Sequence, residues 1–234
     1  MNSNIRNESL KELGAHFENS VIRVASREEV VTVIKKSVEY GFHSVITSPF
    51  LVPLVSQLTK GTNLKIGTAV SFPVGAETPE AKAFAAKDLA DNYPIDEIDF
   101  VMNFAALCAG MPEIVEKECQ LIRAAAPNKV LKMILEVCYL TDDQIRLACK
   151  IAGEARIDFV KSSTGQTKGP SLEQALILVE EAKKYGMMSK VAGVKDPKPQ
   201  NAMAYLLAGI DRIGTQDAIQ IIDGIQTLRD HNIF

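Results

Sequence analysis

The stretch Asp158-Phe159-Val160-Lys161-Ser162-Ser163-Thr164-Gly165 begins as a short apolar run and ends in a loop of small residues. A helical pattern follows at residues 172–185, and a second short apolar run follows at residues 189–192. A strand, a helix and a further strand in this order are typical of parallel sheets, because parallel strands need a crossover connection. The stretch therefore indicates an α/β protein.

The same alternation continues from about residue 19 to the end of the chain. It predicts strands at residues 20–24, 44–47, 65–72, 97–103, 130–137, 159–163, 189–192 and 212–214. It predicts helices at residues 27–40, 79–91, 111–126, 142–155, 172–185, 201–208 and 217–230, several of them preceded by a capping residue (Ser26, Thr78, Thr141 and Ser171). A doubly wound open sheet also alternates strand and helix, but no Gly-x-Gly-x-x-Gly turn follows the first strand.

Eight strand–helix units favour a closed parallel barrel. We therefore predict a single (β/α)8 TIM barrel over residues 1–234, with no second domain. Residues 1–17 have the pattern of a short amphipathic helix, with Leu10, Leu13 and Phe17 on its apolar side. We expect this helix to pack against the barrel or against a partner, and barrels of this kind often self-associate as homo-oligomers.

The composition excludes several classes of function. The formal net charge is −3, whereas a nucleic-acid-binding surface needs clustered basic residues. No apolar run reaches the length of a membrane span, and residues 1–8 do not resemble a signal peptide, so we expect a cytoplasmic protein. We expect no metal site and no disulfides, because neither the cysteines nor the histidines are spaced as ligands; these residues are Cys108, Cys119, Cys138, Cys149, His16, His43 and His231.

Two lysines stand where lysine is rare. Lys161 ends one predicted strand, and Lys190 lies in the next strand along the chain. Burying an ammonium group is costly, and two of them on neighbouring strands repel each other, so the pKa of each falls. A lysine of lowered pKa is a nucleophile for carbonyl carbon. The pair therefore indicates Schiff-base chemistry, although the residue types alone do not show which lysine is the nucleophile.

Neighbouring strands add further charged residues. Alternation along the strands puts Asp99 and Asn103 on one side of the fourth strand, and Lys132 and Glu136 on one side of the fifth. If these sides face inward, the pocket holds three lysines and two carboxylates. Asp99 would then move protons between intermediates, directly or through water. The alternative interpretation of the same residues is a structural ion-pair network inside the barrel.

Read in order, these segments resemble the deoxyribose-phosphate aldolase family of class I aldolases, from about residue 18 to residue 215. The matching segments are the Phe-Pro-x-Gly-Ala signature within residues 65–76, the Asp-Glu-Ile-Asp segment of residues 96–103, residues 132–136 with 140–142, and the lysine segment of residues 158–165. The resemblance implies a TIM barrel in which Lys161 forms an imine with acetaldehyde. It also implies that Lys190 lowers the pKa of Lys161, that Asp99 takes part in proton transfer, and that no cofactor or metal is needed.

The chain departs from the family where the substrate's phosphate would bind. The family has a Gly-Gly pair and then an arginine after the second lysine, whereas this chain has one glycine, Gly193, and then Lys195. The family has Gly-x-Ser-Ser at the last strand, whereas this chain has Gly214-Thr215-Gln216-Asp217. Asp217 would repel a phosphate dianion, while Gln216 and Asp217 can bond sugar hydroxyls. We therefore expect the same aldol chemistry on a substrate whose distal group is neutral or differently charged.

Other differences lie near the two ends of the chain. Glu18-Asn19-Ser20 stands where the family has Asp-x-Thr, and the chain ends at residues 231–234 without the tyrosine that some members use in proton transfer. The candidate substrate-binding residues are Glu18, Ser20, Asn103, Lys132, Ser163, Thr164, Gly165, Gly193, Lys195, Gly214, Gln216 and Asp217.

The predicted function is reversible cleavage of a 2-deoxy sugar, 2-deoxyribose 5-phosphate or an unphosphorylated relative, to acetaldehyde and a shorter aldehyde. One alternative is a related imine-forming barrel aldolase acting on another sugar or keto compound. The other is an inactive barrel that serves as a binding protein. The complete set of Lys161, Lys190 and Asp99 argues against the inactive barrel, because a decayed site has no physical reason to keep repelling lysines buried.

Overall fold

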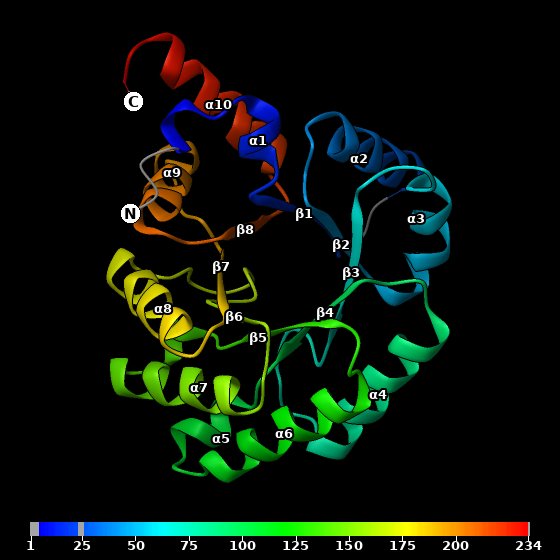
Figure 1. The fold of residues 1–234 in the computed structure, drawn as a ribbon, viewed down its shortest axis with the longest axis vertical. Helices are drawn as coiled ribbons and strands as arrows, with labels where there is room; N and C mark the ends of the chain where they lie inside the picture. Colours follow the sequence, from blue (N-terminus) through cyan, green and yellow to red (C-terminus); the bar gives the residue numbers. More distant parts are fainter. Residues whose placement is uncertain (1–4, 23–25, 234) are drawn as a thin grey trace.

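The computed structural model describes residues 5–22 and 26–233 and confirms the barrel (Figure 1). Eight parallel strands close in sequence order, and β1 pairs with β8 to complete the ring. The strands are β1 Phe17–Val21, β2 Ser44–Thr47, β3 Lys65–Val70, β4 Glu97–Val101, β5 Val130–Ile134, β6 Phe159–Lys161, β7 Met188–Ala192 and β8 Arg212–Thr215. Within the described residues, every helix is too short or too polar to cross a membrane.

Helices surround the barrel (Figure 1). They are α1 Leu10–Gly14, α2 Arg27–Glu39, α3 Val52–Leu58, α4 Pro79–Asn92, α5 Phe104–Cys108, α6 Pro112–Ala125, α7 Asp142–Glu154, α8 Leu172–Lys184, α9 Lys198–Ala208 and α10 Ala218–Asp230. The four predicted capping residues are confirmed, since each accepts a hydrogen bond from a backbone N–H in the first turn of its helix.

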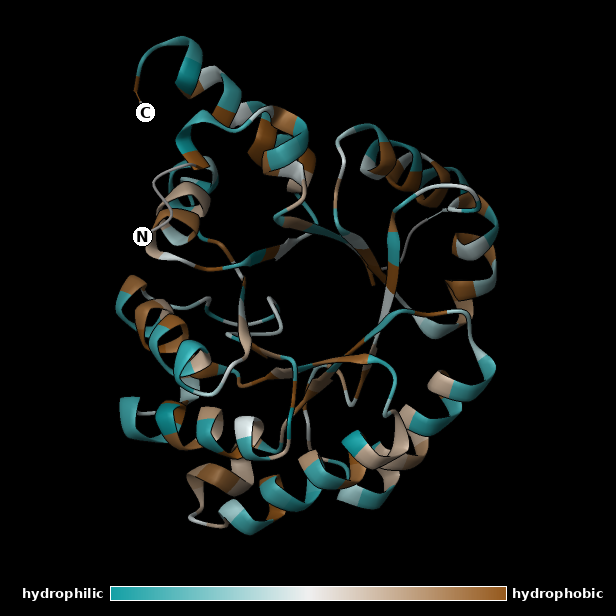
Figure 2. Ribbon diagram, viewed as in Figure 1, coloured by the Kyte–Doolittle hydropathy of each residue, from teal (hydrophilic) through white to brown (hydrophobic). Residues whose placement is uncertain are grey.

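The outer helices are amphipathic, as shown by their mixture of apolar and hydrophilic residues in Figure 2. In α7, for example, Ile145, Ala148, Cys149 and Ala152 are buried at the spacing of one helix face. The apolar core lies between such faces and the strands. Several charged side chains that are buried completely, among them Asp99, are found on the strands, whereas Lys82 of α4 and Glu118 of α6 pair within the helix layer. The fold therefore surrounds a charged barrel interior with a mainly apolar layer.

The prediction for the N-terminal segment was partly wrong. Within residues 5–17, a 3-10 helix (Ile5–Asn7) and the short helix α1 stand in place of the single predicted helix, and Phe17 already belongs to β1; positions 1–4 of the predicted helix lie outside the described residues. The helix ends at Gly14, where the chain passes so close to α2 that a Cβ would come within 2.0 Å of the Tyr40 carbonyl oxygen. Arg229 of α10 donates hydrogen bonds to the carbonyl oxygens of Glu8 and Ile5, at 2.8 and 2.9 Å, which fixes the segment against the barrel.

Several predicted boundaries also move. The first strand begins three residues earlier than predicted, and positions 23 and 24 of the predicted strand lie outside the described residues. β3 to β6 end before their apolar patterns do; after β3 and β5 the chain turns at Ser71 and Glu136, whose φ angles are positive, 58° and 56°. α3 and α5 were not predicted, since helices of seven and five residues are too short to show a clear period. α9 begins at Lys198 instead of residue 201.

Candidate active site

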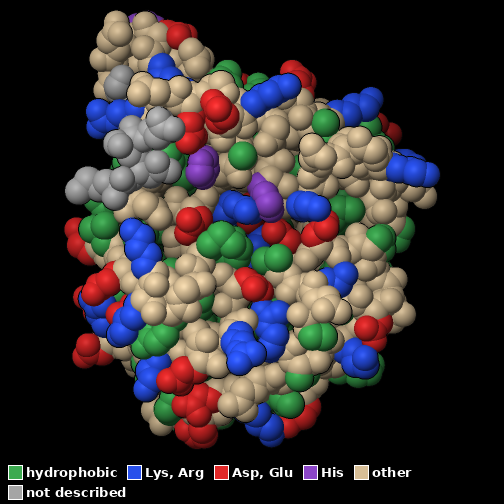
Figure 3. Space-filling view, viewed as in Figure 1, with side chains coloured by type: hydrophobic (Ala, Val, Ile, Leu, Met, Phe, Trp, Pro, Cys, Tyr) green, Lys and Arg blue, Asp and Glu red, His purple; other side chains and the backbone are tan. Residues whose placement is uncertain are grey.

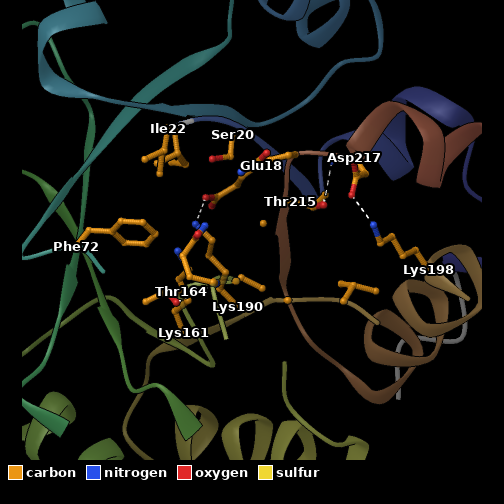
Figure 4. Close-up of a pocket in the computed structure, with 18 residues that line it drawn as sticks. Glu18, Ser20, Ile22, Phe72, Lys161, Thr164, Lys190, Lys198, Thr215 and Asp217 are labelled. Atoms are coloured by element: carbon orange, nitrogen blue, oxygen red, sulfur yellow. Dashed lines mark hydrogen bonds and ion pairs between the residues drawn. The ribbon is translucent and has the colours of Figure 1, made fainter. Parts of the chain in front are cut away.

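A cavity of about 280 Å³ opens at the carboxyl ends of the strands (Figure 4). This is the end of a TIM barrel at which active sites are found. Ten of the predicted site residues line it: Glu18, Ser20, Lys161, Thr164, Gly165, Lys190, Gly193, Gly214, Gln216 and Asp217. Ile22, Ile46, Phe72, Thr215 and Lys198 also line it, and these residues were not predicted. The structure therefore brings the two lysines to one cavity, together with substrate-binding residues that were predicted on the first strand and after the last strands.

The two lysines meet at a single carboxylate oxygen. Lys161 pairs in register with Lys190 on the neighbouring strand, so both side chains reach the same level of the barrel. The Nζ atoms of Lys161 and Lys190 donate hydrogen bonds to Oδ2 of Asp99, at 2.8 and 2.9 Å. Among the residues that the structure describes, Asp99 Oδ1 has no hydrogen-bond partner, and Nζ of Lys132 is 3.6 Å from it. Asp99 is thus an anion shared among three amines.

Further ion pairs continue below this carboxylate. Nζ of Lys132 donates to Oε1 of Glu18 at 2.7 Å and to Oε2 of Glu97 at 2.5 Å. Lys190 also donates to Glu18, and Nη1 of Arg212 is 3.4 Å from Glu18 Oε1 and 4.0 Å from Glu97 Oε1. We call this set of buried charges the ion-pair column; its members are Lys161, Asp99, Lys190, Glu18, Lys132, Glu97 and Arg212.

The ion-pair column contains four basic and three acidic side chains. If all seven were ionised, the interior would carry one uncompensated positive charge, which is costly at low dielectric. A lysine that releases its proton removes this excess. Burial lowers the pKa of Lys161 to about 8, and the charge of Lys190 acts in the same direction, while Asp99 opposes them. Lys161 therefore becomes neutral far more readily than an ordinary lysine.

Lys132 and Asp99, in contrast, are held in their charged forms. Burial would lower the pKa of Lys132, but Glu18, Asp99 and Glu97 outweigh it and raise that pKa above the usual range. Burial would likewise raise the pKa of Asp99, but Lys161, Lys190 and Lys132 outweigh it and hold that pKa well below its ordinary value. The site thus offers a neutral amine beside a carboxylate that stays ionised, and this combination can attack a carbonyl and accept protons.

The opposite side of the cavity is formed by the loops before α9 and α10. Oδ2 of Asp217 accepts a hydrogen bond from Nζ of Lys198 at 2.6 Å, and Figure 4 shows this pair across the cavity from the two lysines. Thr215 Oγ1 accepts a hydrogen bond from the backbone N–H of Asp217 at 3.0 Å. Gly214 lies against Lys190, whose Cε would be 2.7 Å from a Cβ at that position. The glycine therefore leaves room for the lysine.

Five of the predicted residues lie outside the lining of this cavity. Asp99 and Lys132 stand in the ion-pair column. Asn103 caps α5, with its side chain accepting from the N–H of Ala106 at 2.9 Å. Ser163 is buried and donates to the Ala192 carbonyl oxygen at 2.7 Å, and the side chain of Lys195 is exposed.

Two residues of the ion-pair column, Glu97 and Arg212, were not predicted from the sequence. Glu97 lies two positions before Asp99, so the alternation that identified Asp99 also points Glu97 inward. Arg212 begins β8 and thus lies at the amino end of its strand, where catalytic groups of barrels are not expected. Strand alternation was enough to predict Glu97, whereas no comparable sequence pattern indicated Arg212.

A closed parallel barrel with a buried amine of lowered pKa at its carboxyl end defines an enzyme of carbonyl chemistry. Residues 10–198 match the sequence profile described as DeoC/LacD family aldolase, which is well over half of the chain. The chain belongs to the DeoC/LacD aldolase family and is accordingly an aldolase, a type of lyase.

Curated relatives and solved structures agree with this family. The chain is 34% identical over 213 residues to the deoxyribose-phosphate aldolase of Streptococcus gordonii, covering 91% of this chain and 96% of the relative. It is 36% identical over 202 residues to the enzyme of the same name from a Geobacillus species, covering 86% and 89%. The tetrameric deoxyribose phosphate aldolase of Aeropyrum pernix superposes with a TM-score of 0.83 at 26% identity, covering 94% of this chain and 93% of that one.

Proposed function

We propose that the chain is a class I aldolase that cleaves a 2-deoxy sugar reversibly through a Schiff base on Lys161. One observation carries this proposal. Lys161 lines the cavity, and its burial lowers the pKa of its amine to about 8. About one molecule in ten then has the neutral amine at pH 7, compared with fewer than one in a thousand for an ordinary lysine.

The reaction begins with the substrate as its open-chain aldehyde. Nζ of Lys161 attacks the carbonyl carbon C1 and forms a C–N bond, and the carbonyl oxygen gains protons and leaves as water, which produces a protonated imine. The hydroxyl on C3 then loses its proton and the C2–C3 bond breaks. Its electron pair passes to C2 and the imine, so a shorter aldehyde and an enamine result. Protonation of C2 and addition of water release acetaldehyde and regenerate the amine.

Lys190 and Asp99 support these steps without forming the imine. Lys190 adds a like charge beside Lys161, which favours the neutral amine. Asp99 is bonded to both amines and stays ionised, so it can receive a proton from an intermediate, directly or through water. Gln216 lines the same cavity and can bond substrate hydroxyls, whereas the side chains of Glu18 and Thr164 are already bonded to Lys132, Lys190 and Glu136.

The distal end of the cavity supports a substrate with an uncharged tail. Lys198 is the cation that lines this end, and Asp217 already pairs with it at 2.6 Å. A phosphate dianion would have to displace the Asp217 carboxylate and would then face it as a like charge. Sugar hydroxyls, in contrast, can bond Asp217 and Gln216 without displacing either. We therefore propose that the preferred substrate is a 2-deoxy sugar without phosphate.

Two measurements test these proposals. Incubation with acetaldehyde followed by borohydride reduction is expected to leave an adduct on Lys161, which the Lys161→Met variant lacks. Lys82→Met serves as a matched control, because Lys82 is another buried lysine but pairs with Glu118 outside the column. An adduct on Lys190 would reverse the two roles, and no adduct on any lysine would refute the mechanism.

The substrate tail is tested separately by competition. 2-Deoxyribose and its 5-phosphate are offered together, and the ratio of their kcat/KM values is measured. We expect a ratio in favour of the unphosphorylated sugar. A large preference for the phosphate would refute the proposed tail specificity and leave the lysine chemistry intact.

We also propose that the chain works as a homo-oligomer in the cytoplasm. Support for the oligomer comes from the relative of Aeropyrum pernix, which is tetrameric. Light scattering coupled to size-exclusion chromatography measures the mass of the particle. A mass near 25.5 kDa at micromolar concentration would correspond to a monomer and refute this proposal.

A further inference from the structure

The ion-pair column extends from the cavity to the opposite mouth of the barrel. Lys161 is the last residue of β6, whereas Glu97 and Arg212 are the first residues of β4 and β8. At that far end Nε2 of His43 is 3.2 Å from Oε1 of Glu97, and the His43 side chain is 29% exposed. On the face shown in Figure 3, histidine side chains lie near the middle among basic and acidic ones. The catalytic amine is therefore connected by direct contacts to the other side of the molecule.

Lys132 and Lys190 each divide their hydrogen bonds between two carboxylates, whereas Lys161 donates to Asp99. Lys132 joins Glu97 at 2.5 Å to Glu18 at 2.7 Å, and Lys190 joins Glu18 to Asp99 at 2.9 Å. The side chains of Lys132, Glu97, Glu18, Lys190 and Asp99 are all nearly or completely buried. Water screens such charges poorly, so a change of charge at one end alters the field at the other.

We propose that Glu97 is a positioning residue for the aldol reaction: its negative charge, acting through Lys132, Glu18 and the shared carboxylate of Asp99, sets how firmly Lys161 holds its proton. This inference rests on the proposed role of Lys161 as the nucleophile. The charged and titratable groups that face Glu97 are His43, Lys132, Arg212 and, through them, Glu18.

The direction of the effect follows from the charge of the column. Replacing Glu97 by glutamine raises the excess positive charge from one to two, so Lys161 gives up its proton at a lower pH. Replacing Lys132 by methionine removes the excess, so Lys161 keeps its proton to a higher pH. The double replacement restores the original excess of one. A purely structural role would weaken the fold in both single variants and would not move the titration of Lys161 in opposite directions.

The test measures the protonation of Lys161 directly in the full-length chain. Reductive methylation with formaldehyde and cyanoborohydride is followed at a series of pH values, and mass spectrometry quantifies the peptide that contains Lys161. We expect the midpoint to fall by about one pH unit in Glu97→Gln and to rise by about one unit in Lys132→Met, the size of a unit charge acting at an effective dielectric constant of about 20. The double variant should titrate near the wild-type midpoint.

A control and a substitute keep the result interpretable. Glu118→Gln removes a carboxylate that is fully buried against Lys82 but lies outside the column, so it should leave the midpoint unchanged. If Lys132→Met does not fold, Arg212→Gln removes another cation of the column and should shift the midpoint upward as well. Shifts of the same sign in Glu97→Gln and in the variant that lacks a cation, or no shift in either, would overturn the inference.

The outcome is separable from that of the proposed function. Methylation reports the state of any amine and needs no aldol chemistry. Failure of acetaldehyde to trap Lys161 would therefore refute the proposed function, while the midpoints in these variants would still decide whether Glu97 acts on Lys161.

Discussion

Replacement of Lys190 by methionine should convert Lys161 into an ordinary, protonated lysine. The wild-type column holds four basic and three acidic groups, and this change leaves three of each. The interior is then neutral only when Lys161 is an ammonium ion. Methionine has nearly the length of lysine and fills the same apolar path, so the change removes the charge while largely preserving the packing.

The magnitude follows from the shared carboxylate oxygen. The two amines lie no more than about 5.7 Å apart, the sum of their 2.8 and 2.9 Å distances to Asp99 Oδ2. Two unit charges at this separation repel by about 3 kcal/mol at an effective dielectric constant of about 20. That energy corresponds to about two pKa units, so the pKa of Lys161 should rise from about 8 to about 10. At pH 7 the neutral fraction falls about 100-fold.

The assay is the rate at which acetaldehyde and borohydride modify Lys161, measured across a range of pH. Lys190→Met should react about 100-fold more slowly than the wild type at pH 7 and should approach the wild-type rate near pH 10. Lys82→Met, which loses a different buried lysine, should keep the wild-type midpoint. A midpoint in Lys190→Met that stays near 8 or falls would refute the electrostatic role of Lys190.

Three further predictions concern the carboxylates. Asp217→Ser should raise kcat/KM for 2-deoxyribose 5-phosphate relative to 2-deoxyribose by about tenfold, since a like charge is removed from the distal end; an unchanged ratio in competition kinetics would contradict this. Asp99→Asn should lower kcat by about 10² to 10⁴-fold and lower the free energy of unfolding by about 3–5 kcal/mol, measured by steady-state rates and urea denaturation; retention of both would show that Asp99 is dispensable. Burial would raise the pKa of Glu97, but the hydrogen bond with His43 and the charge of Lys132 outweigh it and lower that pKa from 4.5 to about 2. The stability from Glu97 is therefore present above pH 4.5 and lost as the pH falls towards 2, so urea midpoints should drop over this range, and Glu97→Gln should flatten the drop.

Most of the fold could be predicted from local sequence patterns. The eight strands and their helices repeat a single unit, and the capping residues marked where helices begin. The errors lie where the pattern is short or where tertiary contacts decide. The backbone of α1 passes close to Tyr40 at Gly14, and Ser71 and Glu136, which follow β3 and β5, have positive φ. Neither feature leaves a periodic signal in the sequence.

The candidate site could be predicted in part for a different reason. Strand alternation and strand order are enough to place Lys161, Lys190 and Asp99 together, because the register of a parallel barrel puts successive strand ends side by side. The pairing of Asp217 with Lys198 was not predictable, since it joins loops on two different units whose separation only the closed barrel determines. The same is true of the contact between Glu18 and Lys132, which crosses the interior.

The opposing interpretations of the buried charges, an active site or a structural ion-pair network, turn out to describe the same atoms. A structural network would be most stable with equal numbers of acidic and basic groups, since every buried charge would then be compensated. This column has one basic group more than it has acidic groups, and the excess is relieved where the cavity reaches it, at Lys161. Burial lowers the pKa of Lys161, and the positive charge of neighbouring Lys190 acts in the same direction. We therefore infer that burial and the excess of basic groups together favour the neutral amine at Lys161, as the proposed Schiff-base chemistry requires.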